Sequence, residues 1–372
     1  AKMEARGYSY SYDMLGEAAR TMDDAKRYHT AYARAIRAIG ARATGNDIRT
    51  NPGISVKLSA LHPRYEVAQE HRVLSELVPR ARELARLAAA LGLGFNIDAE
   101  ESDRLALSLK VIDRVLDDPA LDGWDGLGVV VQAYGPRAAD TIAWLAAKAE
   151  SLDRKLMIRL VKGAYWDTEI KRAQVMGLNG FPVLTQKPAS DVNYIACARQ
   201  LLTARARLYP QFATHNAHTV AAVLHMAESM GADPADYEFQ RLHGMGEALH
   251  DIVLKAEGTR CRIYAPVGAH KDLLAYLVRR LLENGANSSF VNQIVDENVP
   301  PQEVAACPIA ALDGIGGLNP KIANGPDLFG PNRRNARGWD LTDARDLEDI
   351  AKARGPWADA TFTAAPLIAG TA

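Results

Sequence analysis

The sequence has little cysteine, and its three residues, Cys197, Cys261 and Cys307, are far apart. Without a C-x-x-C pair or a closely spaced even set, neither a disulfide framework nor a cysteine zinc site is expected. A reducing compartment such as the cytoplasm fits best. The 372 residues also lack an excess of charge, because 44 Lys and Arg face 45 Asp and Glu, for a net charge of -1. No broad field is available to attract nucleic acid, so a nucleic-acid partner is not expected.

Several segment types are also missing. No run of about 18 apolar residues predicts a membrane span, and the N-terminus has neither the apolar core nor the cleavage pattern of a signal peptide. Neither G-x-G-x-x-G nor G-x-x-x-x-G-K-[ST] occurs, which disfavours dinucleotide binding of the Rossmann type and P-loop chemistry. Because the chain begins inside a polar helical pattern, we expect it to be a piece of a longer protein.

What the chain does contain is an alternation of short apolar runs with longer segments of helical period. Glycines follow several of the helical segments, at Gly92, Gly231 and Gly258, where helices commonly end. Near-continuous apolar strands that alternate with helices predict a parallel sheet, and eight such units predict a closed β/α barrel. An open doubly wound sheet is the alternative. The runs lie at 53–59, 93–100, 127–134, 155–163, 181–187, 210–216, 237–244 and 261–268.

The same pattern predicts three regions. Residues 1–45 are expected to be an N-terminal helical segment, and residues 46–295 the barrel. The remaining residues, 296–372, include a stretch at 314–340 that is rich in Gly, Pro and Asn. Such composition is typical of an extended connector. We therefore expect that removing the chain from residue 300 onward spares activity.

The predicted strands end in polar residues, which in a barrel meet around one mouth. Any one of them alone could be a solvated loop residue. Together, four cations, one carboxylate and several neutral hydrogen-bonding groups suit a phosphate or carboxylate ligand better than a metal ion. These residues are Lys57, Asp98, Gln132, Arg159, Lys162, Thr185, Lys187, His215, Asn216, Gln240, His243 and Tyr264.

The predicted eighth helix, 270–285, has two distinct faces. Tyr276, Arg279, Arg280 and Glu283 share one arc, opposite an apolar arc of leucines and valine. One interpretation is a surface helix with its polar face in water. In the other, the helix lies across the barrel mouth and the two guanidiniums bind a carboxylate.

A small-residue turn follows the strand at 155–163. The segment VKGAYW, at 161–166, would let backbone amides approach a flat ring or a phosphate closely. Aromatic residues after a strand are equally compatible with simple packing.

Six motifs, GISVKLSALHPRY, NIDAEE, RLVKGAYWD, ATHN, YAPVG and YLVRRLLENGANSSF, resemble the flavin-dependent proline dehydrogenase domain of bifunctional proline utilization A enzymes. The resemblance spans residues 8 to about 295. It implies a distorted (β/α)8 barrel with the eighth helix over its mouth. It also implies FAD, oxidation of L-proline to Δ1-pyrroline-5-carboxylate by hydride transfer to flavin N5, and ubiquinone or menaquinone as electron acceptor.

The resemblance has implications beyond the barrel too. It allows peripheral contact with the inner membrane, where the quinone resides. The segment NGPDLFGPNRRNARGWDL resembles the linker that enters the aldehyde dehydrogenase half of such enzymes. That half lies outside the 372 residues.

The resemblance assigns roles residue by residue. Arg280, Arg279 and Lys57 would bind the proline carboxylate, and Glu17, expected in an N-terminal helix, would pair with Arg279. Tyr264, Tyr276 and Leu242 would form the walls around the substrate ring, and Asp98 would lie near the reacting end. The cofactor would contact Asp98, Gln132, Arg159, Val161, Lys162, Gly163, Ala164, Trp166, Thr185, Lys187, Thr214, His215, Asn216, Gln240, Glu283, Ser289 and Phe290.

Three alternatives remain for the proton of the substrate amine, which could pass to Lys57, to Asp98 or to solvent. Two other functions also remain. One is a metal-dependent hydrolase or lyase that uses His215, His218 and Asp98. The other is a barrel without catalytic activity that serves as a docking module. Since only one carboxylate reaches the mouth, no metal is expected.

Overall fold

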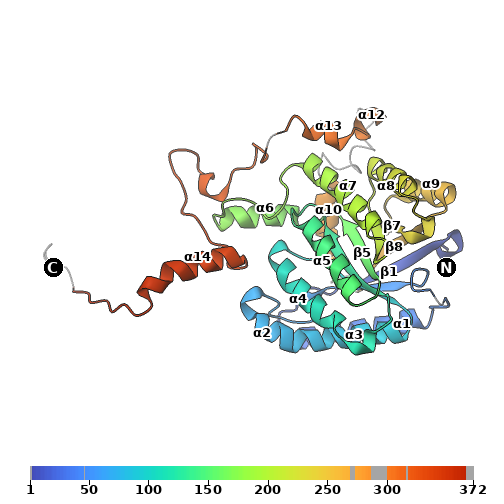
Figure 1. The fold of residues 1–372 in the computed structure, drawn as a ribbon, viewed down its shortest axis with the longest axis horizontal. Coiled ribbons are helices and arrows are strands. Elements are labelled where there is room, and N and C mark those ends of the chain that lie inside the picture. Colours follow the sequence, from blue (N-terminus) through green and yellow to red (C-terminus); the bar gives the residue numbers. More distant parts are fainter. Residues whose placement is uncertain (1, 46, 269–272, 286–299, 316, 366–372) are drawn as a thin grey trace.

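A computed structural model describes residues 2–45, 47–268, 273–285, 300–315 and 317–365. Eight parallel strands form a closed barrel in chain order, with helices between them (Figure 1). The predicted fold class, a (β/α)8 barrel, is confirmed. The strands are β1 (Tyr8–Met14), β2 (Gly53–Val56), β3 (Gly94–Ile97), β4 (Leu127–Gln132), β5 (Leu156–Val161), β6 (Leu208–Ala213), β7 (Glu238–Leu242) and β8 (Arg260–Val267).

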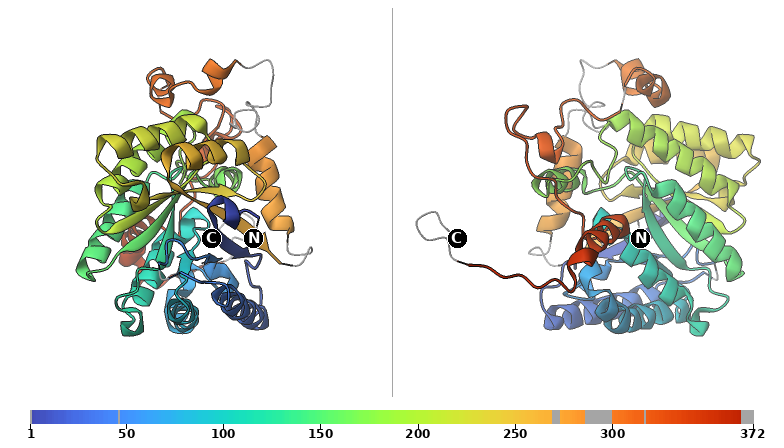
Figure 2. Two further views of the ribbon diagram at one scale, coloured as in Figure 1. Left: turned by 90° about the vertical axis from the view of Figure 1, so that its right-hand side faces the viewer. Right: turned by 60° about the vertical axis from the view of Figure 1, so that its left-hand side comes forward.

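Helices cover the outside of the barrel, and further helices follow the barrel along the chain (Figure 2). Three glycines after them, Gly92, Gly231 and Gly258, have φ of 64°, 62° and 64°, the left-handed conformation that ends a helix. The helices are α1 (Met22–Gly40), α2 (Glu70–Arg72), α3 (Val78–Ala90), α4 (Leu105–Leu116), α5 (Ala138–Ser151), α6 (Trp166–Val175), α7 (Lys187–Thr203), α8 (Ala217–Ser229), α9 (Glu247–Glu257), α10 (Leu274–Gly285), α12 (Pro301–Val304), α13 (Pro308–Leu312) and α14 (Ala344–Arg354).

The helical segment predicted over 1–45 contains the helix α1, but it also contains the first strand, β1, which was not predicted. β1 pairs in parallel with both β2 and β8 and so closes the barrel. Its sequence, YSYSYDM, alternates aromatic and polar residues. Ser11 and Asp13 are buried at 1% exposure each, while Tyr10 and Tyr12 stack on each other with ring centroids 5.4 Å apart. The strand was missed because its inward side chains are polar.

The strand predicted at 181–187 is wrong. This segment is a loop that leads into α7, and β5 pairs directly with β6. The apolar residues that suggested a strand serve a different purpose, because Val183 packs in a small cluster with Tyr134 and Ile170 outside the main core. The other seven predicted runs coincide with β2 to β8.

The interior of the barrel is polar. Arg262 and Glu238 form a fully buried ion pair, with Nε–Oε1 at 2.8 Å, and Arg262 also donates to the carbonyl oxygens of Asn51 and Arg49 at 2.8 and 2.7 Å. Above this pair, Gln211 accepts a hydrogen bond from Asn96 at 3.1 Å. The apolar core therefore lies mainly between the strands and the surrounding helices.

Helix α10 turns its polar face to the barrel mouth, so the surface-helix interpretation is wrong. Tyr276, Arg279 and Arg280 line the cavity there. The opposite face is apolar and open, with Leu274 and Leu281 each 71% exposed. In Figure 2, the orange α10 lies beside the blue N-terminal segment.

The segment after α13, predicted to be an extended connector, makes contacts with the rest of the chain. It runs past α6 to α14, as the orange-to-red chain in Figure 1 shows. Asn319 bonds to Thr185, and Gly338 bonds to Gly177 just after α6. Within the described residues, no helix is both long enough and apolar enough to cross a membrane.

Candidate active site

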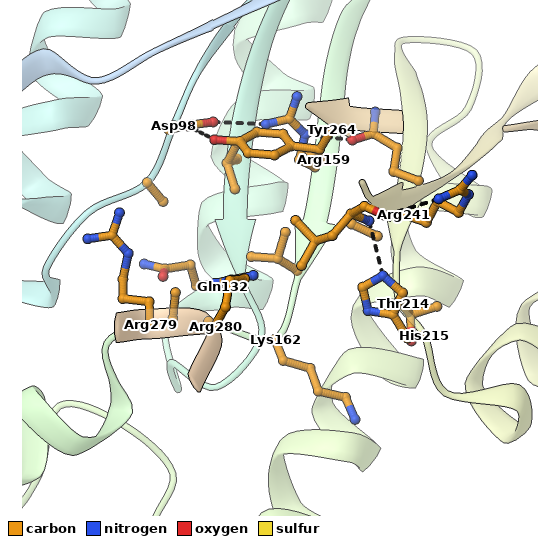
Figure 3. Close-up of a pocket in the computed structure, with 18 of the residues that line it drawn as sticks. Asp98, Gln132, Arg159, Lys162, Thr214, His215, Arg241, Tyr264, Arg279 and Arg280 are labelled. Atoms are coloured by element: carbon orange, nitrogen blue, oxygen red, sulfur yellow. Dashed lines mark hydrogen bonds and ion pairs between the residues drawn. The ribbon is translucent and has the colours of Figure 1, made fainter. Parts of the chain in front are cut away.

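A cavity of about 380 Å³ opens at the C-terminal ends of the strands. Most predicted site residues meet here (Figure 3), and α10 contributes from across the opening. The predicted residues that line it are Lys57, Asp98, Gln132, Arg159, Val161, Lys162, Gly163, Ala164, Lys187, Thr214, His215, Asn216, Gln240, Leu242, Tyr264, Tyr276, Arg279 and Arg280.

Other predicted residues lie elsewhere. Trp166 and Thr185 are not among the lining residues: the indole Nε1 of Trp166 donates to the carbonyl of Leu184 at 2.9 Å, and the Thr185 hydroxyl accepts from the backbone of Asn319. Ser289 and Phe290 fall outside the described residues, as does the side chain of Glu283.

Asp98 is the centre of a buried polar network at the cavity. Its Oδ2 accepts from the Tyr264 hydroxyl at 2.8 Å and from Lys57 Nζ at 3.2 Å, while Oδ1 accepts from Arg159 Nη1 at 2.8 Å (Figure 3). Burial alone would raise the pKa of Asp98, but the charges of Lys57 and Arg159 and the bond from Tyr264 lower it below its usual value. Asp98 is therefore an anion at neutral pH.

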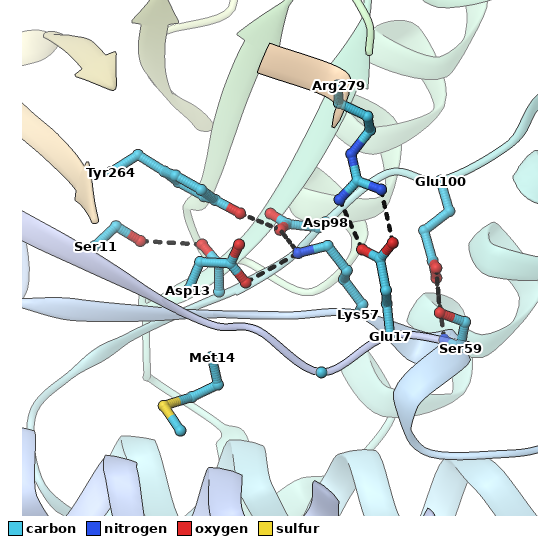
Figure 4. A network of polar contacts seen from close by, with 12 residues as sticks. Ser11, Asp13, Met14, Glu17, Lys57, Ser59, Asp98, Glu100, Tyr264 and Arg279 are labelled. Carbon is cyan, nitrogen blue, oxygen red and sulfur yellow. Dashed lines mark hydrogen bonds and ion pairs between the residues drawn. The ribbon is translucent and has the colours of Figure 1, made fainter. Parts of the chain in front are cut away.

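Lys57 lies between two carboxylates (Figure 4). Its Nζ bonds to Asp13 Oδ1 at 2.9 Å in addition to Asp98. Burial opposes protonation, yet Asp13 and its neighbours raise the pKa of Lys57 well above its usual value. Lys57 is thus a fixed cation at the cavity wall.

Arg159 connects this network to the barrel interior. Its Nε donates to Gln240 Oε1 at 2.7 Å, and its Nη2 donates to Ser11 Oγ at 3.1 Å and Ser55 Oγ at 3.0 Å. The guanidinium also lies 5.1 Å from the centroid of the Tyr264 ring. With all these contacts, its position is set by four strands.

Glu17 and Arg279 form the expected ion pair, with both guanidinium nitrogens on the carboxylate at 2.6 and 2.7 Å (Figure 4). Glu17 lies in the loop after β1, however, and not in a helix. Burial would raise the pKa of Glu17, but the bond and charge of Arg279 lower it.

The loop that carries Glu17 is held by Ser59. Ser59 Oγ accepts from the amide of Ala18 at 3.0 Å, and Ser59 O accepts from Ala19 at 2.9 Å. In turn, the amide of Ser59 donates to Glu100 Oε1 at 3.0 Å. These bonds fix Ala18 at φ 51°, an uncommon conformation for a residue with a side chain.

His215 is held as a neutral ring. Its Nε2 accepts a hydrogen bond from the amide of Leu242 at 3.0 Å, so the ring proton resides on Nδ1. Burial lowers the pKa of His215 to about 3, helped by the positive charge of nearby groups such as Arg280. The side chain is suited to hydrogen bonding within the cavity.

Two lysines at the other side of the cavity share one carboxylate. Asp191 pairs with Lys162 and, at 2.7 Å, with Lys187, across the step from β5 to α7. Burial would raise the pKa of Asp191, but the two lysines lower it. A pair of cations held this way can receive a multiply charged anion.

Sequence reasoning missed several lining residues, above all Asp13, Tyr165 and Arg241. Asp13 could have been found from the alternation in YSYSYDM, which is the pattern of a strand. Arg241 is buried at 2% exposure, with its guanidinium 5.0 Å from the ring of Tyr8. No pattern in the sequence marks it.

The cavity fits a flavin nucleotide by its chemistry. Arg159 and Gln132 offer donors of the kind that a flavin ring requires, and Lys162 and Lys187 offer charge for a pyrophosphate. The turn after β5, which contains Lys162, also contains Gly163 at φ 135°, where an added Cβ would lie 2.6 Å from the Tyr134 ring. Among the described residues, no group of three or more His, Cys, Asp or Glu is placed to hold a metal ion.

A family model described as "Proline dehydrogenase" matches residues 1–293. The chain belongs to the proline dehydrogenase family. The family predicted from the sequence is thereby confirmed.

Members of the proline dehydrogenase family align along nearly the whole chain. "Bifunctional protein PutA" of Salmonella typhimurium is 52% identical over 364 residues, which cover 95% of this chain but 28% of the relative. A mutant of Bradyrhizobium japonicum proline utilization A superposes with a TM-score of 0.90 at 54% identity, covering 95% of this chain and 37% of that one. A further bifunctional proline utilization A structure gives 0.91 at 52% identity, with 97% and 36% covered. The chain thus spans about a third or less of the length of these relatives.

Proposed function

We propose that this chain oxidises L-proline to Δ1-pyrroline-5-carboxylate with FAD as cofactor and passes the electrons to a quinone. One observation carries the proposal: three cations, Lys57, Arg279 and Arg280, line a single cavity that also contains the Asp98 network. Such a set suits a small amino acid whose carboxylate needs several charged donors. The match to the proline dehydrogenase family supports the choice of proline.

Substrate binding is assigned to α10 and β2. Arg279 and Arg280 would bind the carboxylate together with Lys57, and the ion pair with Glu17 would keep Arg279 in a fixed orientation; the shared cavity and this ion pair support the assignment. Tyr264, Tyr276 and Leu242 then form the apolar walls around the ring. This arrangement sets distance and angle for the reaction, which accounts for much of the rate gain in a bimolecular step.

Cofactor binding is assigned to residues in the C-terminal halves of β4 to β7 and in the segments that follow these strands. Arg159 and Gln132 would bond the flavin ring, and Lys162 and Lys187 would bind the pyrophosphate. When bound, FAD supplies at N5 the acceptor for the hydride that leaves the carbon next to the proline nitrogen. From the family resemblance, we also propose cofactor contacts for Trp166, Thr185, Glu283, Ser289 and Phe290.

The amine proton of proline is assigned to solvent. Lys57 already carries its proton, because Asp13 and Asp98 raise its pKa well above the usual value after burial is taken into account. Asp98 accepts three hydrogen bonds and has a lowered pKa, so it is a poor base. Both groups hold the substrate in place while its nitrogen lone pair is freed by loss of the proton to water.

The physiological context follows the same proposal. Ubiquinone or menaquinone would accept the electrons during peripheral contact with the inner membrane, and the protein would otherwise be cytoplasmic. The aldehyde dehydrogenase half would belong to the full-length protein.

The decisive experiment uses the purified chain with added FAD. We expect a bound flavin absorbance band that bleaches when L-proline is added without oxygen and returns when a soluble quinone is added. Proline methyl ester, which lacks the carboxylate anion, should bleach it far more slowly. A colourless protein that does not bind FAD and carries stoichiometric zinc would contradict the proposal. Such a result would favour a hydrolase that uses His215, His218 and Asp98.

A further inference from the structure

The segment at 319–338 packs against two parts of the chain that adjoin cavity-lining residues. One is α6, which follows β5, and the other is the loop that precedes α7. One contact is at Thr185, where the hydroxyl oxygen accepts from the Asn319 amide at 3.0 Å and the carbonyl accepts from Asn319 Nδ2 at 3.4 Å. The other is at the end of α6, where Gln174 Nε2 donates to the carbonyl of Ala323 at 2.9 Å. A single segment therefore connects α6 with the loop that leads to α7.

The backbones in this contact approach too closely for any side chain. The amide of Gly338 donates to Gly177 O at 2.9 Å, and a Cβ added to Gly338 would lie 1.6 Å from Met176 O. A Cβ on Gly325 would lie 2.6 Å from the Cα of Gly177. Neither Gly325 nor Gly338 has a positive φ, so close approach and not backbone strain requires glycine at both positions.

The segment also completes a small apolar cluster. Ile322 packs against Tyr134, Ile170 and Val183, apart from the main core. Val183 belongs to the loop at 181–186, and Tyr134 accepts the amide of Leu184 on its carbonyl at 2.7 Å. The loop is thus held from the barrel side by Tyr134 and from the outer side by Ile322 and Asn319.

These contacts act on residues at the cavity. Lys187 lines the cavity as the first residue of α7, directly after the loop. Helix α6 contacts the segment with its C-terminal end, and its N-terminal end follows the turn that contains Lys162 and Gly163. Because Asp191 pairs with both Lys162 and Lys187, a shift of either segment changes the spacing of two cations.

We propose that residues 319–338 are a positioning element of the cofactor site, which fixes the loop at 181–186 through Thr185 so that Lys187 is held for a pyrophosphate-containing ligand. This rests on the proposed function, in which FAD is that ligand. Without the docked segment, binding must first order the loop, and the apparent affinity falls by the fraction of molecules in which the loop is already ordered.

The test uses the complete 372-residue chain with two substitutions, Gly325→Ala and Gly338→Ala, in one variant. Gly314→Ala is the matched control, because an added Cβ there meets nothing within 4 Å. FAD affinity is measured by titrating the FAD-free protein and following flavin fluorescence. We expect the dissociation constant to rise at least tenfold in the double variant and to stay within twofold of the wild type in the control.

A second measurement separates positioning from a general loss of structure. With FAD saturating, the KM for proline of the double variant should stay within twofold of the wild type, because Lys57, Arg279 and Arg280 are not touched. Hydrogen exchange in the FAD-free protein should increase at 178–187 and stay unchanged in β1 to β4. Ile322→Ala, a milder change, should raise the FAD dissociation constant in the same direction if the double variant does not fold.

The outcomes are distinguishable. A wild-type chain that does not bind FAD would overturn the proposed function and this inference with it. A wild-type chain that binds FAD, together with a double variant of equal affinity, would overturn the inference alone. A rise in proline KM equal to the rise in FAD dissociation constant would also overturn it, since the segment would then support the whole barrel.

Discussion

At the scale of single residues, the site combines fixed cations with one central anion. Asp98 accepts bonds from Lys57, Arg159 and Tyr264 in a largely buried network at the cavity wall, so each member depends on the others. Arg279 pairs with Glu17, and Arg280, on the same helix turn, lines the cavity with its guanidinium 5.4 Å from the centroid of the Tyr276 ring.

Arg280→Met is expected to raise the KM for proline by roughly 10- to 100-fold, because a charged hydrogen bond contributes about 1.5–3 kcal/mol. The side chain of methionine keeps most of the apolar volume, so the fold should remain intact by circular dichroism. Arg199→Met on the exposed face of α7 is the control and should leave KM unchanged. An unchanged KM in Arg280→Met would show that α10 does not bind the carboxylate.

Glu100 gives a prediction about pH. Burial raises its pKa from 4.5 to about 7, against the lowering effect of Arg104 and Ser59. Between pH 4.5 and 7 the folded protein therefore binds more protons than the unfolded chain, so its stability falls as pH rises. Glutamine does not titrate, so the free energy of unfolding of Glu100→Gln should not fall in this way. Relative to that of the wild type, it should rise by up to roughly 3 kcal/mol between pH 5 and 8.

Urea unfolding of the FAD-free protein at several pH values measures this difference. Glu228→Gln, at an exposed position on α8, is the control and should give a curve parallel to that of the wild type. Parallel curves for Glu100→Gln would mean that Glu100 is already ionised in the folded protein at pH 5.

At the scale of elements, apolar pattern predicted β2 to β8, and polar strand ends predicted most of the cavity. The prediction failed at β1, because its inward residues Ser11 and Asp13 are polar and alternate with tyrosines, unlike the near-continuous apolar runs of the other strands. It also failed at 181–187, whose apolar residues pack in a separate cluster that the distant Ile322 also joins. Both errors come from contacts between segments that are far apart in sequence.

The helix ends were predictable because they depend on one residue each. Gly231 ends α8 at φ 62°, and an added Cβ would meet nothing within 4 Å, so the cost of a side chain is strain alone. Gly231→Ala should lower the free energy of unfolding by about 1 kcal/mol. Gly355→Ala, where φ is -50°, should change it by less than about 0.5 kcal/mol in the same urea titration. Equal effects would mean that the left-handed cap is not required.

At the scale of the whole molecule, the packed unit is longer than the family match. The proline dehydrogenase model ends at residue 293, but the contacts of Asn319, Ile322 and Gly338 extend the packed structure to residue 338. By contrast, α14 has no buried residues. That removal of the chain from residue 300 onward spares activity stays a prediction, and the truncation would take away the contacts made by the part up to 338.

FAD should stabilise this whole unit. At a free concentration 100 times its dissociation constant, a ligand that binds only the folded state adds about 2.7 kcal/mol to the free energy of unfolding. Urea unfolding with and without FAD measures this gain. Riboflavin, which has no pyrophosphate for Lys162 and Lys187, should give a clearly smaller gain at the same concentration. An equal gain would mean that the two lysines do not contribute to binding.

The polar interior of the barrel also has a consequence for assembly. Side chains on a strand alternate between its two faces, so pairing a strand one residue out of step would turn Arg159, Glu238 or Arg262 into the apolar layer beneath the helices. An unpaired charge in that apolar layer would destabilise the misaligned protein by several kcal/mol. Misalignment of an apolar residue would destabilise it far less. The charges that line the interior thus select the correct strand alignment during folding, before any ligand is present.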